Sequence, residues 1–416
     1  MYKYILLIFI LNAIFLCSCS KFNPFDDKVQ TSSDGAYVIE TGMTDEELLS
    51  YGQNVVYRFK SVPNMVAVKE INIGKQSHNY IYLTNIYNLP FENIKIRMNS
   101  LNNYKIQTDL SNCNSSYCEA NFDKTYSEIS AKNLTLNPVN VAIIDSGVIP
   151  ATIQIKNNLV SSYNLTGIID TSSWSSHATY IASIFTGITK GNSLLNVYAK
   201  NVKLNSVKIN FAEDNISDDM KNYGSMQLAA ALDTAVYSGA KIVNLSLSYL
   251  QEPDQNVEMA EKIVISNASK SGVIFIVAAG NDGNNFNKFP TYPAAYNLNN
   301  MITVASHAYN LSLASSSNYG DSIELSAQGS QIDLNSKNGS IDTVGGTSFS
   351  GPLVASAISI YLGLFPNTDL NTLLNHLFSS ANSYYNPIYS SKNITLTKYG
   401  RLDTKAFIDL GFSNIQ

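Results

Sequence analysis

The sequence is poor in charge and in histidine, and it shows no internal repeat. Charged residues make up only 14% of the 416 residues and hydrophobic residues 45%, which excludes an intrinsically disordered chain. The formal net charge of −5 gives no reason to expect a nucleic-acid partner. The length is sufficient for two domains, one of them with a large core. With only four histidines, a catalytic imidazole has few candidates.

Long apolar runs are also scarce, and we find one candidate membrane segment, at the N-terminus. Residues 1–20 place one lysine before an apolar run of about thirteen residues, which is short for a bilayer of about 30 Å. This pattern is typical of a secretory signal, residues 1–18. Residues 16–19, Leu-Cys-Ser-Cys, resemble the lipobox of bacterial lipoproteins, although Cys17 stands where a small residue is usual. We therefore expect an exported protein, lipid-anchored to a membrane of the cell envelope through Cys19. A plain cleaved signal peptide and an uncleaved anchor are the alternatives.

Cysteines outside the leader are limited to Cys113 and Cys118. Because an exported chain enters an oxidising compartment, we expect them to form a small disulfide loop, with two free buried thiols as the alternative. No histidine lies nearby to complete a metal site. The acidic stretch AEDNISDD, residues 212–219, lacks EF-hand spacing, so calcium has no specific motif and no cofactor is expected to be required.

The N-terminal third divides into three parts. Residues 19–35 are polar and predict a tether. Residues 36–98 read as strand, helix, two strands and a further strand, and Thr44 with Glu47 forms a capping box at the start of the helix. This order predicts a small α+β domain. Residues 99–135, rich in Asn and Ser, are expected to be a linker that carries the cysteine pair.

From residue 136 to 412 the pattern changes to apolar strands that alternate with helices. Strand candidates such as VNVAIIDSG and VIFIVAAG are apolar on both faces, and stretches such as HATYIASIFTG are typical of helices. A parallel sheet with both faces covered produces such strands. The sequence therefore predicts an α/β domain with a doubly wound, mainly parallel sheet flanked by helices.

The stretch GGTSFSGPLVASA, residues 345–357, places one serine at a junction between a loop and a helix. Gly345 and Gly346 permit a close approach of another part of the chain, and Pro352 is expected in the first helical turn. Unpaired N–H groups and the helix dipole gather at such a position, which suits a nucleophile whose reaction creates an oxyanion. Alternatively, Ser348 is simply an N-cap residue.

Polar residues elsewhere in the chain favour the interpretation of Ser348 as a nucleophile. Asp145 follows one predicted strand, Asn281 follows another, and His177 begins a helix. In doubly wound sheets ligands bind at the carboxyl ends of the strands, where these residues fall. Acid, imidazole, hydroxyl and amide are the groups needed for acyl transfer, with Ser348 as nucleophile, His177 as base, Asp145 orienting the imidazole and Asn281 receiving the oxyanion.

On these residues the sequence resembles the subtilisin-like serine proteases, or subtilases, over most of residues 136–412. The resemblance implies a serine endopeptidase with Ser246, Leu247 and Ser248 beside the bound peptide. Its motifs occur in the family order: VAIIDSGV, HATYIASIFTG, KIVNLSLS, VAAGNDG, YPAAYNLNNMITVAS, GGTSFSGPLVASA and YGRLDTKAFI.

Three positions depart from the family pattern. Ala178 stands where Gly is usual, Tyr180 where a second His is usual, and Ser248 where Gly is common. The first two are the support for an alternative, a non-catalytic subtilase-fold domain that binds peptides or proteins at the envelope. An esterase is a further alternative, disfavoured because the KIVNLSLS strand suits pairing with a peptide main chain.

Residues 36–98 also resemble, in pattern, the inhibitory propeptide of subtilases, with an unrelated interaction domain as the alternative. The resemblance implies that the chain's own N-terminal domain inhibits the enzyme and that the protein processes itself. Because the lipid anchor precedes this domain, a cut between about residues 99 and 135 would remove the catalytic domain's covalent link to the membrane.

Overall fold

The computed structural model describes residues 25–26, 36–70, 79–80, 116–166, 171–190, 193–195, 197–209, 226–250, 255–382 and 396–413. The expected leader with Cys19, the expected strand at 93–98, Cys113 and the acidic stretch 212–219 lie outside the described residues. Cys118 falls within a described helix, but its side chain is not among the described ones. The expected lipid anchor and disulfide therefore stay predictions.

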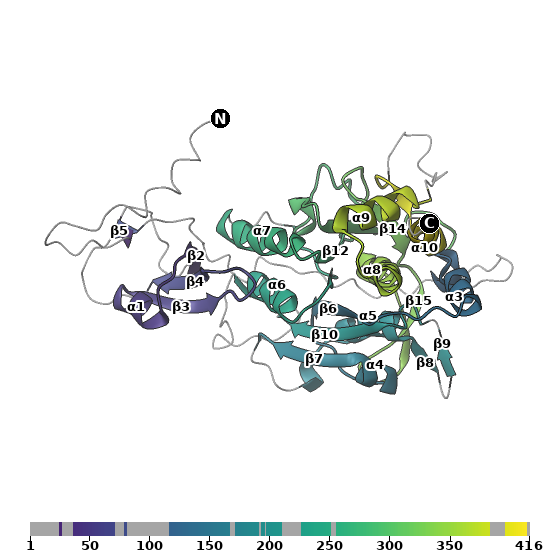
Figure 1. Cartoon of the computed structure of the whole chain (residues 1–416), viewed down its shortest axis with the longest axis horizontal. Coiled ribbons are helices and arrows are strands. Elements are labelled where there is room, and N and C mark those ends of the chain that lie inside the picture. The colour runs from purple at the N-terminus through teal and green to yellow at the C-terminus, as the bar shows by residue number, and fades with distance from the viewer. Residues whose placement is uncertain are drawn as a thin grey trace, which may run out of the picture.

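An eight-stranded sheet forms the centre of the larger domain, and its neighbouring strands pair in parallel throughout the described residues. The strand order is β17-β14-β13-β12-β11-β6-β10-β7. Figure 1 labels β14, β12, β6, β10 and β7 of this sheet, in that order from top to bottom. The predicted doubly wound α/β architecture is confirmed. The strands are β6 (Val139–Asp145), β7 (Leu159–Asn164), β10 (Val202–Lys208), β11 (Ile242–Leu245), β12 (Ile274–Ala278), β13 (Met301–His307), β14 (Leu325–Gln328) and β17 (Gly400–Arg401).

Helices cover both faces of this sheet, and its central strands are buried on both sides. Along β6, Ile143 packs with α5 (His177–Thr186) and α8 (Thr347–Leu364), whereas Ile144 packs with α6 (Gln227–Tyr237) and α7 (Gln255–Ser269). Successive strand residues point to opposite faces, so the two buried clusters follow from the sequence period. By length and composition α8 could cross a membrane, but it is the buried core helix of this domain.

Smaller elements complete the larger domain. Two antiparallel pairs, β8 with β9 and β15 with β16, lie outside the large sheet. These remaining elements are α4 (Ile153–Asn158), η2 (Thr171–Ser173), β8 (Ile188–Lys190), β9 (Ser193–Leu195), η5 (Ala294–Tyr296), β15 (Ile332–Asn335), β16 (Ile341–Val344), α9 (Leu370–Ser379) and α10 (Thr404–Ser413).

The N-terminal domain has the predicted order of a strand, a helix and two strands. It comprises β2 (Ala36–Glu40), α1 (Asp45–Ser50), β3 (Gln53–Arg58) and β4 (Met65–Glu70), with antiparallel strand order β2-β4-β3. The predicted capping box is confirmed: the Glu47 N–H donates to Thr44 Oγ1 at 3.2 Å, and the Thr44 N–H donates to Glu47 Oε2 at 2.7 Å. A further short pair joins β1 (Phe25–Asp26) and β5 (Asn79–Tyr80).

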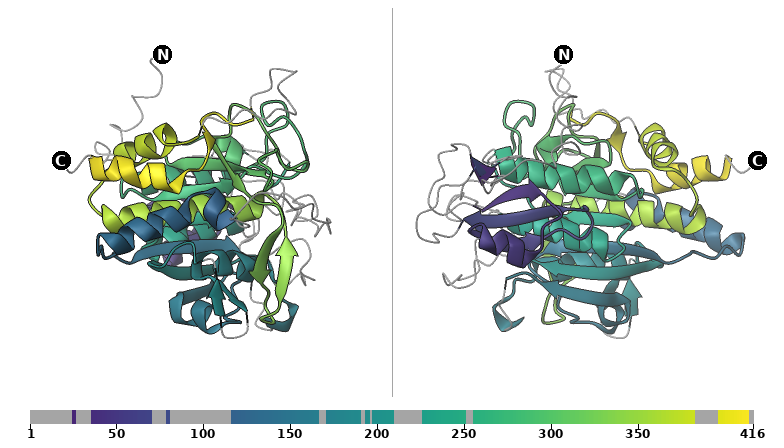
Figure 2. Two further views of the ribbon diagram at one scale, coloured as in Figure 1. Left: turned by 90° about the vertical axis from the view of Figure 1, so that its right-hand side faces the viewer. Right: turned by 60° about the vertical axis from the view of Figure 1, so that its left-hand side comes forward.

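This N-terminal domain, purple in Figure 2, packs against α6 and α7 of the larger domain, as the right view of that figure shows. The contact centres on Asp233 of α6, which is fully buried. Its carboxylate accepts hydrogen bonds from the Tyr57 hydroxyl at 2.7 Å, the Lys60 N–H at 2.9 Å, and the Ser61 N–H and hydroxyl at 2.7 and 2.5 Å. On α7, the Asn267 amide donates to the Ser61 carbonyl at 2.6 Å.

The expected linker differs from the structure at residues 116–131. These residues form α2 (Ser116–Glu119) and α3 (Phe122–Ala131), which pack into the core of the larger domain. Phe122, Tyr126 and Ile129 are buried and lie on one helical face, and the surrounding polar residues conceal this pattern in the sequence. The larger domain therefore begins before residue 136.

An ion-pair cluster holds α2 in place. Glu119 pairs with Arg401 of β17, and its Oε2 lies 3.2 Å from Nε2 of His307 at the end of β13. We call Glu119, His307 and Arg401 the Glu119 cluster. Burial alone would raise the pKa of Glu119, but the hydrogen bonds and charges of His307 and Arg401 together lower it. His307 thus lies in a buried strand and joins distant segments of the chain.

Candidate active site

Asp145 and His177 meet at the carboxyl end of the sheet. Asp145 is the last residue of β6 and is fully buried, and His177 is the first residue of α5. His177 Nδ1 lies 2.8 Å from Asp145 Oδ2 and 3.0 Å from Oδ1. The Ser146 N–H donates to Asp145 Oδ1 at 2.6 Å, which fixes the carboxylate. A buried acid at Nδ1 leaves Nε2 as the nitrogen that can exchange a proton with a substrate or nucleophile.

Two serines fix the start of α5. The Ser175 hydroxyl accepts from the His177 N–H at 3.2 Å, and the Ser146 hydroxyl accepts from the Ala178 N–H at 3.2 Å. These bonds satisfy first-turn N–H groups that the helix itself leaves unpaired. Ala178, one of the departures from the family pattern, is fully buried within the core around α5. The imidazole is therefore presented from a helix start that is tied to the strand carrying Asp145.

Ser348 lies in the first turn of α8. The N-cap residue is Gly346, with no capping bond from a side chain, so the alternative of an N-cap serine is wrong. The Gly346 φ of 142° lies in the region that favours glycine, and its N–H donates to the Gly329 carbonyl at 2.6 Å. Pro352 lies in the second turn of α8 rather than the first, because the helix already begins at Thr347.

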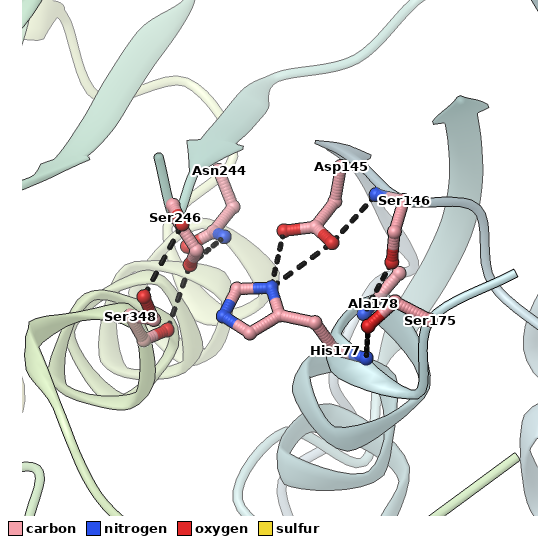
Figure 3. Close-up of polar contacts among 8 residues, drawn as sticks. All are labelled: Asp145, Ser146, Ser175, His177, Ala178, Asn244, Ser246 and Ser348. Atoms are coloured by element: carbon pink, nitrogen blue, oxygen red, sulfur yellow. Dashed lines mark hydrogen bonds and ion pairs between the residues drawn. The ribbon is translucent and has the colours of Figure 1, made fainter. Parts of the chain in front are cut away.

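The imidazole of His177 lies between Asp145 and Ser348. Figure 3 shows α5 and α8 directing His177 and Ser348 toward each other, with Ser348 on the side of the ring away from Asp145. In this structure the Ser348 hydroxyl donates to the Ser246 carbonyl at 3.2 Å. A serine hydroxyl can rotate to another acceptor at little cost, so the arrangement allows a hydrogen bond to the imidazole.

Asn281 lies on the loop after β12, beside the start of α8. Its side-chain carbonyl accepts from the Thr347 N–H and from the Thr347 hydroxyl, both at 2.9 Å. Because the carbonyl is engaged twice, the NH₂ end of the planar amide faces away from Thr347. The amide can thus donate to a negatively charged oxygen near the start of α8, where the helix dipole also favours negative charge.

Residues 246–248, which we call the edge segment, continue β11 without joining the sheet. Ser246 is tied to the backbone of Ser348, since its hydroxyl donates to the Ser348 carbonyl at 2.7 Å and accepts from the Asn244 amide at 2.8 Å. Leu247 is buried, and Ser248 is followed by a bridge in which Tyr249 and Tyr292 exchange backbone hydrogen bonds of 2.9 Å. The edge segment is therefore extended and held beside Ser348.

Tyr180, the second departure from the family pattern, ties α5 to the β15–β16 hairpin. Its hydroxyl donates to Asp342 Oδ2 at 2.5 Å. Burial, followed by the hydrogen bond and charge of Asp342, raises the pKa of Tyr180 to about 12, so the hydroxyl stays a donor at neutral pH. The ring of Phe349 lies 5.6 Å from that of His177 and 6.3 Å from that of Tyr180, between centroids. Tyr180 thus braces the helix that presents His177.

The sequence reasoning missed several supporting residues. Ser146 and Ser175 adjoin the predicted Asp and His, so a search for hydroxyls beside these two residues could have found them. Tyr180 and Asp342 are 162 positions apart, and no local pattern links them. The structure brings Asp145, His177, Ser348 and Ser246 together, and it places Asn281 beside Thr347.

The fold and the site define a serine hydrolase built on a parallel sheet, with the order Asp, His, Ser along the chain. Residues 137–403 match the model of the subtilase family, and the chain belongs to this family. It is a serine-type endopeptidase.

Known proteins agree with this assignment. Subtilisin DY from Bacillus licheniformis is 26% identical over 266 residues, which cover 62% of this chain and 88% of that protein. Subtilisin Savinase from Lederbergia lenta is 27% identical over 253 residues, covering 61% and 86%. The crystal structure of the epidermin leader peptide processing serine protease from Staphylococcus aureus aligns over 91% of this chain and 98% of its own, with a TM-score of 0.61 and 19% identity. This last likeness concerns the fold alone, and it extends beyond the residues that match the family.

Proposed function

We propose that this endopeptidase cleaves peptide bonds through an acyl-enzyme formed on Ser348. The Ser348 oxygen attacks the substrate carbonyl while His177 Nε2 takes the hydroxyl proton, and the bond to the leaving amine breaks as His177 returns that proton to the amine. Water then attacks the acyl-enzyme by the same route, and the acid product leaves. Asp145 holds the imidazole and stabilises its protonated form. The 2.8 Å contact between His177 Nδ1 and Asp145 Oδ2 carries this proposal.

The negative charge that forms on the carbonyl oxygen is received by Asn281 and by the Ser348 N–H. The support is that the Asn281 carbonyl is already engaged by Thr347, so its NH₂ end is the end available to donate. The edge segment is the proposed site for the substrate main chain, since an extended strand can pair with an extended peptide. Ser246, Leu247 and Ser248 would then lie beside the bound peptide.

The N-terminal domain acts, in this proposal, as an inhibitor of the same chain. Its support is the buried carboxylate of Asp233, which accepts bonds from Tyr57, Lys60 and Ser61. A domain held by a buried charge with several donors binds firmly yet can still be released by cleavage.

We further propose export and lipid anchoring at Cys19, with self-processing that removes the covalent link to the membrane. The mechanism uses only side chains and a backbone N–H of the protein itself, so we propose that no cofactor is required and that activity persists in EDTA.

A fluorophosphonate probe tests the mechanism directly, because it reacts with an activated serine. Wild-type protein should be labelled and should cleave casein, and Ser348→Ala should lose both, with a rate loss of roughly 10⁶-fold. Ser350→Ala is the matched control, since this buried serine lies on the same helix two positions away. Labelling that survives in Ser348→Ala would place the reactive serine elsewhere in the chain. A wild type that binds peptides but is neither labelled nor able to cleave them would favour the non-catalytic alternative. Mass spectrometry of the purified N-terminus tests acylation at Cys19.

A further inference from the structure

Glu261 of α7 is a buried carboxyl group that the proposed mechanism does not use. It is 1% exposed, and its Oε2 lies 2.9 Å from the Tyr249 hydroxyl and 2.6 Å from the Tyr296 hydroxyl. The two hydroxyls lie 2.9 Å from each other. Three oxygens thus form a closed triangle inside the protein, and we call Glu261, Tyr249 and Tyr296 the tyrosine–glutamate triangle.

A count of protons shows which form of Glu261 fits this triangle. Each tyrosine supplies one proton, so an ionised Glu261 leaves one of the three oxygen–oxygen contacts without a hydrogen. A neutral carboxylic acid supplies the third proton, and each oxygen then donates once and accepts once around the ring. Burial raises the pKa of Glu261 to about 7, although the hydrogen bonds from Tyr296 and Tyr249 oppose this rise. Geometry and burial therefore both favour the neutral acid below neutral pH.

The triangle is joined to the edge segment through Tyr249. Tyr249 directly follows Ser248, and its backbone exchanges two hydrogen bonds with Tyr292. The Tyr249 ring also stacks on that of Tyr292, with 6.0 Å between centroids. When the contact between the two hydroxyls loses its proton, Tyr249 loses one of the bonds that fix its side chain. The edge segment, which precedes Tyr249 and is assigned to the substrate main chain, then loses part of the contacts that hold it in place.

We propose that Glu261 is a positioning residue that, in its neutral form, holds the edge segment for peptide binding through Tyr249. This inference rests on the proposed function, because it assigns the edge segment to the substrate main chain. It predicts that peptide binding weakens as Glu261 ionises, while the chemistry at Ser348 is unchanged. Substrate affinity and turnover should therefore respond differently to pH.

The charged groups around Glu261 are few among the described residues. On its own helix, Glu258 adds a negative charge that raises the Glu261 pKa, and Lys262 places its Nζ 5.3 Å from the centre of the Tyr296 ring. From outside α7, the hydroxyls of Tyr249 and Tyr296 contact the Glu261 carboxyl group. Of the other elements that pack on α7, β12 has no charged residue and α6 has Asp233, which is bonded to the N-terminal domain. The exposed Glu40 ends β2.

Two substrates separate positioning from chemistry. A blocked tetrapeptide p-nitroanilide, chosen from the cleavage products of casein, extends along the edge segment, whereas p-nitrophenyl acetate is too short to do so. For the wild type, KM for the tetrapeptide should rise about three- to tenfold between pH 6 and pH 9, the effect of about one net hydrogen bond. The KM for the ester should not follow this rise. A pH effect on the chemistry at Ser348 is common to both substrates and cancels in the comparison.

Glu261→Gln keeps a neutral side chain at every pH, so its KM for the tetrapeptide should be independent of pH, with the kcat profile of the wild type. Glu258→Gln, the matched control on the same helix, should retain a rise in KM, displaced toward lower pH because the charge that raises the Glu261 pKa is gone. Tyr249→Phe should raise KM at pH 6 by a similar factor, and Tyr296→Phe serves if Glu261→Gln does not fold. A wild-type rise that persists in Glu261→Gln, or that appears equally with the ester, overturns the inference. A wild type that cleaves neither substrate overturns the proposed function, and this inference with it.

Discussion

Replacement of Asp233 by alanine should loosen the N-terminal domain from the catalytic domain. The carboxylate accepts bonds from four donor groups: the Tyr57 hydroxyl, the Lys60 N–H, and the N–H and hydroxyl of Ser61. Each bond to a charged group contributes about 1.5–3 kcal/mol, but water replaces part of this when the surfaces separate. Loss of one partner of a buried, hydrogen-bonded charge typically costs about 2–5 kcal/mol.

For Asp233→Ala we expect the free energy needed to separate the two domains to fall by about 3 kcal/mol. At 1.36 kcal/mol per factor of ten, this corresponds to a roughly hundredfold increase in domain opening. Hydrogen exchange of residues 53–70 measures this opening, in a Ser348→Ala background that prevents self-cleavage. Asn267→Ala removes one bond to Ser61 and should increase opening by about five- to tenfold. Glu258→Gln, whose carboxylate pairs with Lys262 on its own helix, should leave exchange unchanged.

The graded response distinguishes a specific anchor from a general loss of stability. Exchange in β6 and β12, at the centre of the catalytic sheet, should stay slow in all three variants. If residues 53–70 exchange in Asp233→Ala as slowly as in the unmodified background, the carboxylate does not hold the N-terminal domain, and the proposed inhibitor would need another basis. If the central strands exchange faster as well, the variant has destabilised α6 rather than the contact.

Asn281→Ala should lower kcat about 10²- to 10³-fold with little change in KM, because the amide acts on charge that forms in the transition state; steady-state kinetics on a peptide check this, and an equal change in KM would argue against it. Tyr180→Phe removes the hydroxyl bond to Asp342 and should lower thermal stability by about 1–2 kcal/mol, measured by calorimetry, with fluorophosphonate labelling slowed but retained. Glu119→Gln should make thermal stability depend less on pH in acid solution. The Glu119 pKa lies below its usual 4.5, so the Glu119 cluster stabilises the fold above that pH, and this stability disappears as pH falls through the lowered value. Thermal melts from pH 6 to pH 3 would show the same acid loss in both proteins if this reasoning is wrong.

Much of the catalytic domain could be predicted because its central strands are apolar on both faces. β6 is apolar apart from Asn140 and its last residue, Asp145, β12 is apolar throughout, and each ends at or near a residue of the site. β7 was not predicted, because it lies at the sheet edge, where most of its positions are exposed and carry polar and apolar residues without a clear pattern. The helix α3 was taken for linker, since only a few apolar side chains mark its buried face. The sequence pattern thus predicts fully buried strands well and partly buried strands and helices poorly.

The site shows the same division between local and distant information. Asp145, His177 and Ser348 could be predicted because each stands at a strand end or a helix start, where parallel architecture brings residues together. The brace from Tyr180 to Asp342 could not, because it depends on how a distant hairpin folds over α5. The position of Pro352 was misjudged because helix starts carry an uncertainty of a residue or more in sequence reasoning.

The packing of α2 and α3 limits where the protein can be shortened without harm. The Ala120 carbonyl accepts from the Thr404 N–H at 3.0 Å, and the ring of Phe122 lies edge-on against Tyr198, with 5.2 Å between centroids. A chain that starts at residue 136, where the apolar strands begin, would leave Tyr198 and the C-terminal helix facing water. Any protease that matures this enzyme therefore has to cut before Ser116 if the released domain is to keep α2 and α3 packed against it.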